Sequence, residues 1–212
     1  MRRWAIIGLV GFVGVTGAGF TATYILKMRR AADHVGCANQ LREIGLFAAH
    51  HADPNQPDPT KVPLEIPAGT VVLPGVAPDD RLSWVPRVLP GLDQRRQSTA
   101  ELVAGIRPLE PFASEANQAA ARVRLRGVFC PANVPPTDPA TASPTCFVGI
   151  AGLGADAARL PRPDPRAGCF QYDGPTPFAA IADGLSQTIM LGERSGDLGP
   201  WLRGGAATVR GL

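Results

Sequence analysis

The segment Trp4–Leu26 carries no charged side chain, and no other feature of the chain restricts its fold as strongly. A helix of that length rises roughly 35 Å, enough to cross a hydrocarbon core of about 30 Å. Basic residues flank the segment on both sides, at Arg2, Arg3, Lys27, Arg29 and Arg30. The sequence therefore predicts a single transmembrane anchor over residues 1–30, with residues 4–26 in contact with the lipid bilayer.

A cleaved signal peptide is the main alternative to an anchor. The apolar run is longer than a typical signal-peptide core, and no small-x-small cleavage site follows it. Its several glycines do not form a dinucleotide-binding fingerprint, because the chain lacks the preceding strand and the acidic partner of a βαβ unit. Gly14, Ala18 and Ala22 have the spacing of a contact between membrane helices. The two basic flanks are similar, so charge alone leaves the orientation open.

The helical pattern continues beyond the anchor. Apolar residues recur at spacings of three and four between Ala31 and Ala52, which is the period of an amphipathic helix. Asp53-Pro54 ends this pattern, because the residue before a proline is disfavoured in the helical conformation. Residues 31–53 are therefore predicted to continue the anchor helix, with an apolar face that packs against the rest of the chain.

Residues 54–212 are predicted to form an α+β head. The chain holds 22 prolines and 24 glycines, and most of the prolines lie between Pro54 and Pro177. This composition favours turns, short strands and long loops over a helical bundle. Short strands or extended runs are expected at Val71–Leu73, Leu82–Leu89, Val123–Phe129, Cys146–Ile150 and Thr188–Leu191. Helices are expected at Ser98–Ile106 and Ser114–Arg122, with Ser114 as an N-cap, and loops at Pro131–Pro144 and Pro161–Pro177.

The charge pattern and the polar residues predict neither a nucleic-acid partner nor an enzyme. The net charge is only +3, and several basic residues are already used to flank the anchor. His50, His51 and Asp53 suggest metal ligation, but adjacent helical residues point about 100° apart, so a polar helix end is preferred. The chain contains no nucleophile elbow, P-loop or zinc-protease motif. No catalytic residue, metal or cofactor is therefore predicted.

The four cysteines are Cys37, Cys130, Cys146 and Cys169. None forms a Cys-x-x-Cys pair, so a zinc knuckle or a thioredoxin-type site is not expected. An even number of cysteines beside a membrane anchor favours disulfides in an oxidising compartment. Four reduced thiols in a cytoplasmic domain remain the alternative, and spacing alone leaves three disulfide pairings open.

Several segments resemble, in order, the motifs of one known family. They are Cys37–Leu46, Ser83–Pro90 with Leu92–Gln94, Phe129–Pro131, Phe147–Gly152, Gly168–Phe170 and Ile181–Glu193. The family is DUF1559, the pilin-like or pseudopilin-like proteins expanded in planctomycetes. The longest match, Ile181–Glu193, is similar to the family pattern I-x-DG-x-SNT-I-x-x-GE. It supplies the motif residues Asp183, Gly184, Ser186, Thr188, Gly192 and Glu193.

The resemblance implies a pilin-like architecture, in which a long N-terminal helix packs on a small β-rich head. It implies a single-pass protein of the cytoplasmic membrane, with the N-terminus inside and the head in the periplasm or extracytoplasmic space. It also implies no catalytic activity, and other pilin-like proteins as partners. It also implies the pairing Cys37–Cys130, since both fall on family cysteine positions, and by extension Cys146–Cys169. Two family features are missing: the prepilin-peptidase signal before the apolar run, and the usual C-terminal tail with its histidine.

The Asp183-Gly184 pair is the most prominent polar motif of the head. Asp-Gly is a turn signature, and the residues that follow it are expected to enter a strand that Glu193 ends. Asp183 and Glu193 are also potential calcium ligands, but a complete site needs six to eight oxygens. The structural interpretation, a turn followed by a strand, is preferred.

The sequence thus favours a membrane-anchored, pilin-like envelope protein with a structural or interaction role in cell-envelope or secretion-related assembly. A second hypothesis is a membrane-tethered extracytoplasmic binding module, whose proline-rich loops recognise a glycan, a peptide or a surface component. A third, an envelope hydrolase, has least support, because Ser143, Ser186 and Ser195 have no evident base partner in the sequence.

Overall fold

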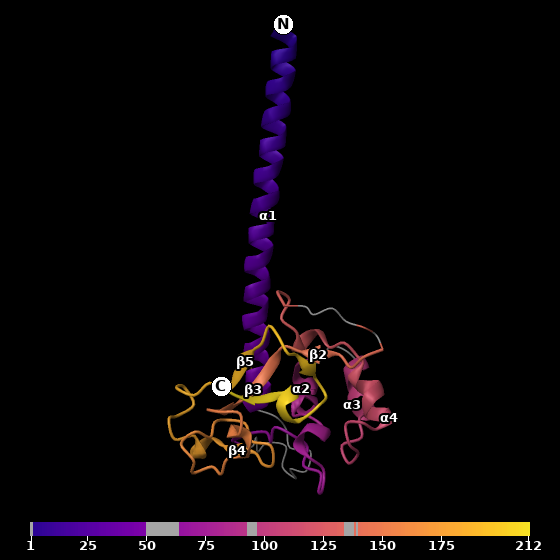
Figure 1. The fold of residues 1–212 in the computed structure, drawn as a ribbon, viewed down its shortest axis with the longest axis vertical. Helices are drawn as coiled ribbons and strands as arrows, with labels where there is room; N and C mark the ends of the chain where they lie inside the picture. Colours follow the sequence, from indigo (N-terminus) through magenta and orange to yellow (C-terminus); the bar gives the residue numbers. More distant parts are fainter. Residues whose placement is uncertain (1, 50–63, 93–96, 134–137, 139) are drawn as a thin grey trace.

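The computed structural model describes the backbone of residues 2–49, 64–92, 97–133, 138 and 140–212, and within α1 the side chains from Thr21 onward except Ala22. The dominant element is α1, Arg2–Ala49, a single helix whose N-terminal part extends away from the head (Figure 1). The predicted helix end at Asp53 lies outside the described residues. α1 contacts the head through Cys37, Ile44 and Ala48, which are buried at helical spacing.

The part of α1 that extends beyond the head has exposed large apolar side chains. Tyr24, Leu26 and Met28 are each more than half exposed. Within the stretch of chain whose side chains are described, no helix combines the length and the apolar character that a membrane crossing requires. Trp4–Leu26 lies mostly outside that stretch, so the predicted anchor stays a prediction.

The head is a mixed α+β unit, and its described residues form three small sheets. Its central strand is β3, Phe147–Gly152, which lies between β5, Leu191–Glu193, and β7, Val209–Gly211. β5 pairs antiparallel with β3, and β7 pairs parallel with it. Two further antiparallel pairs join β1, Glu65–Ile66, to β4, Thr176–Pro177, and β2, Pro144–Thr145, to β6, Gly199–Pro200.

Short helices complete the head. The α-helices are α2, Val85–Leu92, α3, Gln97–Gly105, and α4, Glu115–Ala121. Single 3-10 turns occur at Pro78–Asp80, Arg126–Val128, Ala157–Arg159, Phe178–Ala180 and Gly205–Ala207. The helices predicted near α3 and α4 are confirmed, and the Ser114 side chain accepts a hydrogen bond from the Asn117 backbone N–H as an N-cap.

The core of the head is built around two tryptophans. Trp84 and Trp201 are both buried, and the Trp84 ring lies 5.0 Å from the Phe170 ring, centroid to centroid. Each indole N–H donates to a backbone carbonyl, Trp84 to Thr208 at 3.1 Å and Trp201 to Val123 at 3.1 Å. Residues far apart in the chain therefore meet in one apolar cluster, and its polar atoms are paired.

Three of the predicted segments form no regular strand, although Leu82 and Ser83 make isolated β-bridges. Leu82–Leu89 was expected to be extended, but α2 begins at Val85. Val85, Val88 and Leu89 are buried at helical spacing, and Pro86 lies in the first turn, where its missing N–H costs little. Val123–Phe129 instead contains a 3-10 turn. Val71–Leu73 forms no strand, although the Val71 N–H donates to the Leu82 carbonyl at 2.8 Å.

The strands predicted at Cys146–Ile150 and Thr188–Leu191 come out differently. The first is confirmed as β3, which runs from Phe147 to Gly152. The second is displaced, because β5 starts only at Leu191. Thr188 still belongs to the preceding turn, since its hydroxyl donates to the Gly184 carbonyl at 3.0 Å.

Candidate functional site

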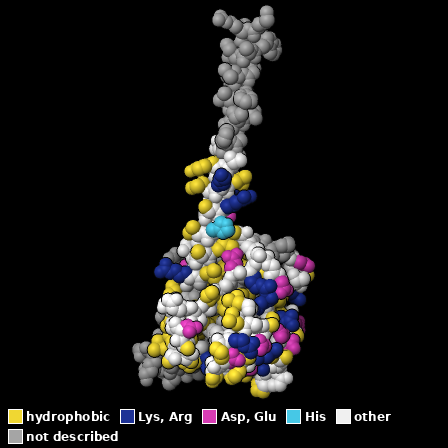
Figure 2. All heavy atoms as spheres, turned by 60° about the vertical axis from the view of Figure 1, so that its left-hand side comes forward, with side chains coloured by type: hydrophobic (Ala, Val, Ile, Leu, Met, Phe, Trp, Pro, Cys, Tyr) yellow, Lys and Arg dark blue, Asp and Glu magenta, His cyan; other side chains and the backbone are white. Residues whose placement is uncertain are grey.

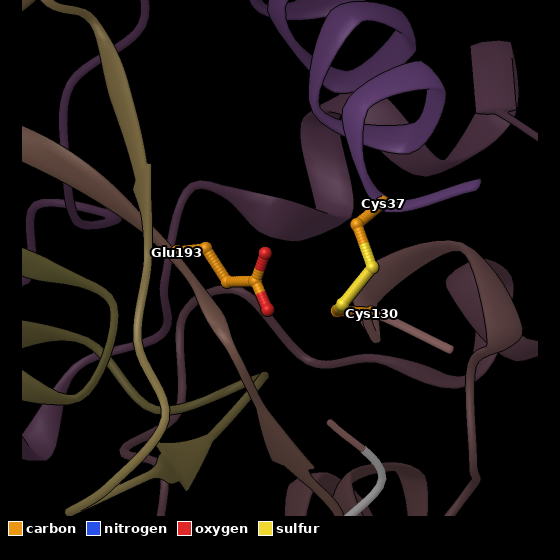
Figure 3. Close-up of side chains that lie close together, drawn as sticks. All are labelled: Cys37, Cys130 and Glu193. Carbon is orange, nitrogen blue, oxygen red and sulfur yellow. A yellow bond between two sulfur atoms is a disulfide. The ribbon is translucent and has the colours of Figure 1, made fainter. Parts of the chain in front are cut away.

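A disulfide between Cys37 and Cys130 joins α1 to the head, and we call it the clasp (Figure 3). Cys37 lies on α1, and Cys130 follows the 3-10 turn Arg126–Val128. The two residues are 93 positions apart, and both are almost fully buried. This is the pairing that the family resemblance implied. The clasp holds the amphipathic half of α1 covalently on the head.

Glu193 is the third member of this cluster. Its carboxylate and the two sulfur atoms of the clasp lie within 4.8 Å of one another, and Figure 3 shows the carboxylate directed toward the disulfide. Cysteine, cysteine and glutamate are residue types that bind zinc, but zinc needs thiolates, and both sulfurs are consumed in the disulfide. The arrangement instead places a negative charge beside a buried S–S bond.

We expect Glu193→Gln to accelerate reduction of the clasp severalfold when the reductant is an anionic thiolate. A thiolate must approach the sulfur along a path that the Glu193 carboxylate makes repulsive. The measurement is the rate of clasp opening with 2-mercaptoethanesulfonate, followed by mass spectrometry of alkylated peptides. Glu110→Gln, which removes an exposed charge elsewhere on the head, is the matched control. An equal acceleration by an uncharged phosphine would contradict the electrostatic explanation.

The predicted bridge between Cys146 and Cys169 is wrong, because both residues are free, buried thiols. Cys146 directly precedes β3, whereas the segment around Cys169 pairs with its far end: the Phe170 N–H donates to the Ile150 carbonyl at 3.1 Å. Four residues of strand separate these points by roughly 13 Å, well beyond the Cα separation of a disulfide, about 7 Å at most. The Cys146 sulfur instead accepts the backbone N–H of Cys130 at 2.9 Å.

Burial raises the pKa of both the Cys146 and the Cys169 thiol to about 11. A raised thiol pKa favours the folded state while the unfolded chain stays protonated, and this stabilisation is lost as the pH rises from about 9 to about 11. We therefore expect the free energy of unfolding to fall over that range by roughly 2 kcal/mol for each thiol. The measurement is urea denaturation of the wild type and of a Cys146→Ala/Cys169→Ala variant at several pH values. The difference between their free energies of unfolding gives the contribution of the two thiols. Parallel pH profiles for the two proteins would refute it.

The Ile181–Glu193 motif divides into a turn and a strand. Gly184 has a φ of +80°, and its N–H donates to the Ile181 carbonyl at 3.0 Å, so Asp183-Gly184 lies in a tight turn. Ser186 is exposed near this turn, and Gly192 pairs with Val148 in the central sheet. Asp183 lines the groove described next, whereas Glu193 lies beside the clasp, so the two carboxylates have different surroundings.

A groove of about 410 Å³ lies between the two loops that follow β3 and β4. One wall consists of residues 162–165, 167 and 168, and the other of residues 180–183. Gln171, Thr176 and Thr188 complete the lining. The first loop is held against the end of β3 by backbone hydrogen bonds, from Leu153 to Arg166 at 2.8 Å and from Gly168 to Ala151 at 2.6 Å. The volume of the groove is in the range of small-molecule binding sites.

The close approach of the first wall depends on Gly152. This residue has a φ of +120°, and a Cβ atom there would lie 1.9 Å from the Arg166 carbonyl oxygen. Only glycine fits both the backbone conformation and the space. The family-like segment Phe147–Gly152 thus ends in a residue that positions one wall of the groove.

Thr176 is the one buried residue of the groove lining, at 2% exposure. Its Oγ1 has no hydrogen-bond partner among the described residues. Buried hydroxyls are normally paired, and an unpaired one costs free energy. Thr176 therefore holds a buried, unpaired hydroxyl next to the groove.

We expect Thr176→Val to raise the free energy of unfolding of the ligand-free protein by about 1 kcal/mol, because it removes an unpaired buried hydroxyl without changing the volume. Thr145→Val is the matched control. That buried hydroxyl donates to the Val128 carbonyl at 2.8 Å, so its loss should destabilise the head. The free energies of unfolding of the two variants are measured by urea denaturation. A destabilised Thr176→Val protein would show that the hydroxyl is already satisfied.

Among the residues that the structure describes, the remaining polar residues singled out in the sequence form no catalytic constellation. His34 is exposed on α1, and His50, His51 and Asp53 lie outside the described residues. None of Ser143, Ser186 and Ser195 hydrogen-bonds to a histidine in the described part of the chain. Sequence reasoning missed Arg162, Asp164 and Thr176, because nothing in the pattern of the proline-rich loop marks the groove that they share.

These features define a class of protein: a small α+β head, stapled by a disulfide to a long N-terminal helix that extends beyond it. Residues 27–210 match the family described as "Protein of unknown function (DUF1559)". The chain belongs to the DUF1559 family. Comparison with curated proteins and with solved structures found no match.

Proposed function

We propose that this DUF1559 protein is a membrane-tethered, pilin-like envelope protein, with its head held outside the cytoplasm in a structural or interaction role. The observation that carries the proposal is the continuity of α1. One helix, Arg2–Ala49, includes the uncharged segment Trp4–Leu26 and also the face that packs on the head (Figure 1). A helix of this kind fixes the distance and the angle between a bilayer and the head.

The residues between the head and the proposed anchor support this arrangement. Lys27, Arg29 and Arg30 are exposed on α1 next to exposed apolar residues, and Figure 2 shows basic and hydrophobic side chains side by side on this part of the helix. Basic side chains of this kind lie at the level of lipid headgroups when a helix enters a membrane. The head would then stand just above the headgroup layer.

The clasp supports the proposed orientation. A buried disulfide that closes a long loop persists in oxidising compartments, and the cytoplasm keeps thiols reduced. We therefore place the N-terminus of α1 in the cytoplasm and the head in the periplasm. Long helices that carry small heads assemble through their helices in pilin-like systems, so other pilin-like proteins are the partners we propose.

The test combines fractionation with protease protection of the full chain. We expect the protein to remain in the membrane pellet after carbonate extraction, and Leu9→Arg/Gly14→Arg to release it by placing two charges in the anchor. Protease added to spheroplasts should digest the head, and non-reducing peptide mapping should recover Cys37 joined to Cys130. A head protected from protease, with free Cys37 and Cys130 thiols, would overturn the orientation.

A second function, a membrane-tethered binding module, is favoured by one observation: the groove contains the unpaired, buried Thr176 hydroxyl. The groove also lies beside the proline-rich loop that the sequence suggested for recognition. Tethering and binding are compatible, since the groove residues belong to the head and not to α1.

A further inference from the structure

We propose that the groove binds a small zwitterion of the amino acid or short-peptide class, with its carboxylate on Arg162 and its ammonium group on Asp183. The inference rests on the head acting as a binding module, and it does not depend on the anchor or on its orientation. Three features of the lining carry it: an oriented cation, an unpaired anion, and the buried hydroxyl of Thr176.

Arg162 supplies the oriented cation. Its Nη2 donates to the backbone carbonyls of Pro175 and Gly174, which fixes one edge of the guanidinium to the neighbouring loop. Arg162 lines the groove, and its Nε and Nη1 have no hydrogen-bond partner in the described part of the chain, so both can still donate to a ligand. Glu65 acts on the same guanidinium electrostatically. A planar guanidinium with two spare donors is suited to a carboxylate, which it binds in a bidentate manner.

Asp183 supplies the anion. It is exposed in the turn that forms the opposite wall, and no described residue makes a hydrogen bond or an ion pair with its carboxylate. Asp164, on the Arg162 wall, differs in this respect, because Arg166 compensates it through a backbone N–H at 2.8 Å and through Nε at 3.5 Å. Asp183 is therefore the acid of the groove that is free to bind a cationic group.

The buried Thr176 hydroxyl adds the third contact. It both donates and accepts, so it can pair with either oxygen of a carboxylate or with a peptide amide. A ligand that hydrogen-bonds to this hydroxyl removes the free-energy penalty of leaving it unpaired in the ligand-free protein. That free energy contributes to binding. The groove of about 410 Å³ thus has a cation and an anion in its lining, with the buried hydroxyl of Thr176 beside them.

Other ligand classes fit this lining less well. Saccharide sites rely on aromatic faces, and none of the residues that line the groove is aromatic. A simple anion would be attracted by Arg162 but repelled by the two carboxylates. In the described part of the chain, the single cluster with three metal-binding side chains is the one at the clasp, away from this lining. A ligand that carries both charges matches both walls.

Isothermal titration of the full chain in detergent micelles with glycylglycine tests the proposal. We expect saturable binding that weakens at least tenfold when the probe is N-acetylglycylglycine or glycylglycine amide, because each modification removes one charge. Arg162→Gln should bind glycylglycine and its amide with equal affinity. Asp183→Asn should bind glycylglycine and the acetylated probe with equal affinity. Glu110→Gln and Arg159→Gln, which remove charges outside this groove, should leave the affinity unchanged.

Thr176→Val separates a ligand contact from a structural role. We expect it to weaken glycylglycine binding severalfold while the ligand-free protein becomes more stable, two effects of opposite sign that a misfolded variant would not show. The absence of any heat with glycylglycine, or binding of glucose in its place, would overturn the zwitterion proposal. Neither result would affect the membrane fractionation or the protease protection that test the proposed tether.

Discussion

Replacing Cys37 and Cys130 by serine should lower the free energy of unfolding of the head by on the order of 4–5 kcal/mol. The clasp closes a loop between residues that are 93 positions apart, and long loops lose the most conformational entropy when they are cross-linked in the unfolded chain. For a small domain this is a large share of the total stability, which is typically 5–15 kcal/mol. The amphipathic half of α1 should be the first part to detach, since Cys37, Ile44 and Ala48 are its main buried residues.

Urea denaturation followed by tryptophan fluorescence measures this effect, because Trp84 and Trp201 are both buried in the head. Reduction of the wild-type protein should reproduce the shift of the double variant, and Cys169→Ala, which touches no disulfide, should not. If the double variant unfolds at the urea concentration of the wild type, the clasp contributes no stability and α1 is held by packing alone.

The second large effect is expected at Asn117, a fully buried residue of α4. Its side-chain amide nitrogen donates to the carbonyls of Arg107, Glu110 and Pro111 at 3.0–3.3 Å, and its Oδ1 accepts the Arg107 N–H at 2.9 Å. One side chain therefore satisfies the backbone of the whole turn before α4. We expect Asn117→Asp to cost about 3 kcal/mol or more, because a carboxylate replaces the donor and faces three carbonyl oxygens.

The measurement is again the urea midpoint, with Gln118→Glu as the control. Gln118 is the neighbour of Asn117, and its side chain makes a single hydrogen bond to the Phe112 carbonyl, so the same chemical change should cost far less there. Hydrogen exchange should also show the 107–111 backbone losing protection in Asn117→Asp. Similar losses for the two variants would mean that α4 responds to added charge and not to the broken network.

Sequence reasoning succeeded where the signal is local or is shared with the family. The helix through Ala49, the Ser114 N-cap, the β3 strand and the Cys37–Cys130 pairing each follow from a periodic pattern, a capping residue or a motif. It failed for α2, because an alternating apolar stretch with prolines reads as extended until its neighbours are known. In the structure α2 packs against α1, and Val88 and Leu89 are buried in the core, which favours the helix over an extended run.

The groove and the Asn117 network were invisible in the sequence for a different reason. Arg162, Thr176 and Asp183 share a groove only because the loops after β3 and β4 fold toward each other. An unpaired hydroxyl becomes informative only when its burial is known, and the same holds for an asparagine that pairs with three carbonyls. Contacts of this kind depend on tertiary structure and not on residue spacing.

The position of β7 has a consequence for how the protein is made. Val209–Gly211 pairs parallel with β3 in the central sheet, and the nearby Trp201 and Leu202 are fully buried. The core therefore remains open during synthesis until the residues around 209 have emerged. In the proposed orientation, Cys37 and Cys130 would reach an oxidising compartment before them. Oxidation can thus join α1 to a head that has not yet folded, and the final strand closes the sheet around a covalent link that already exists.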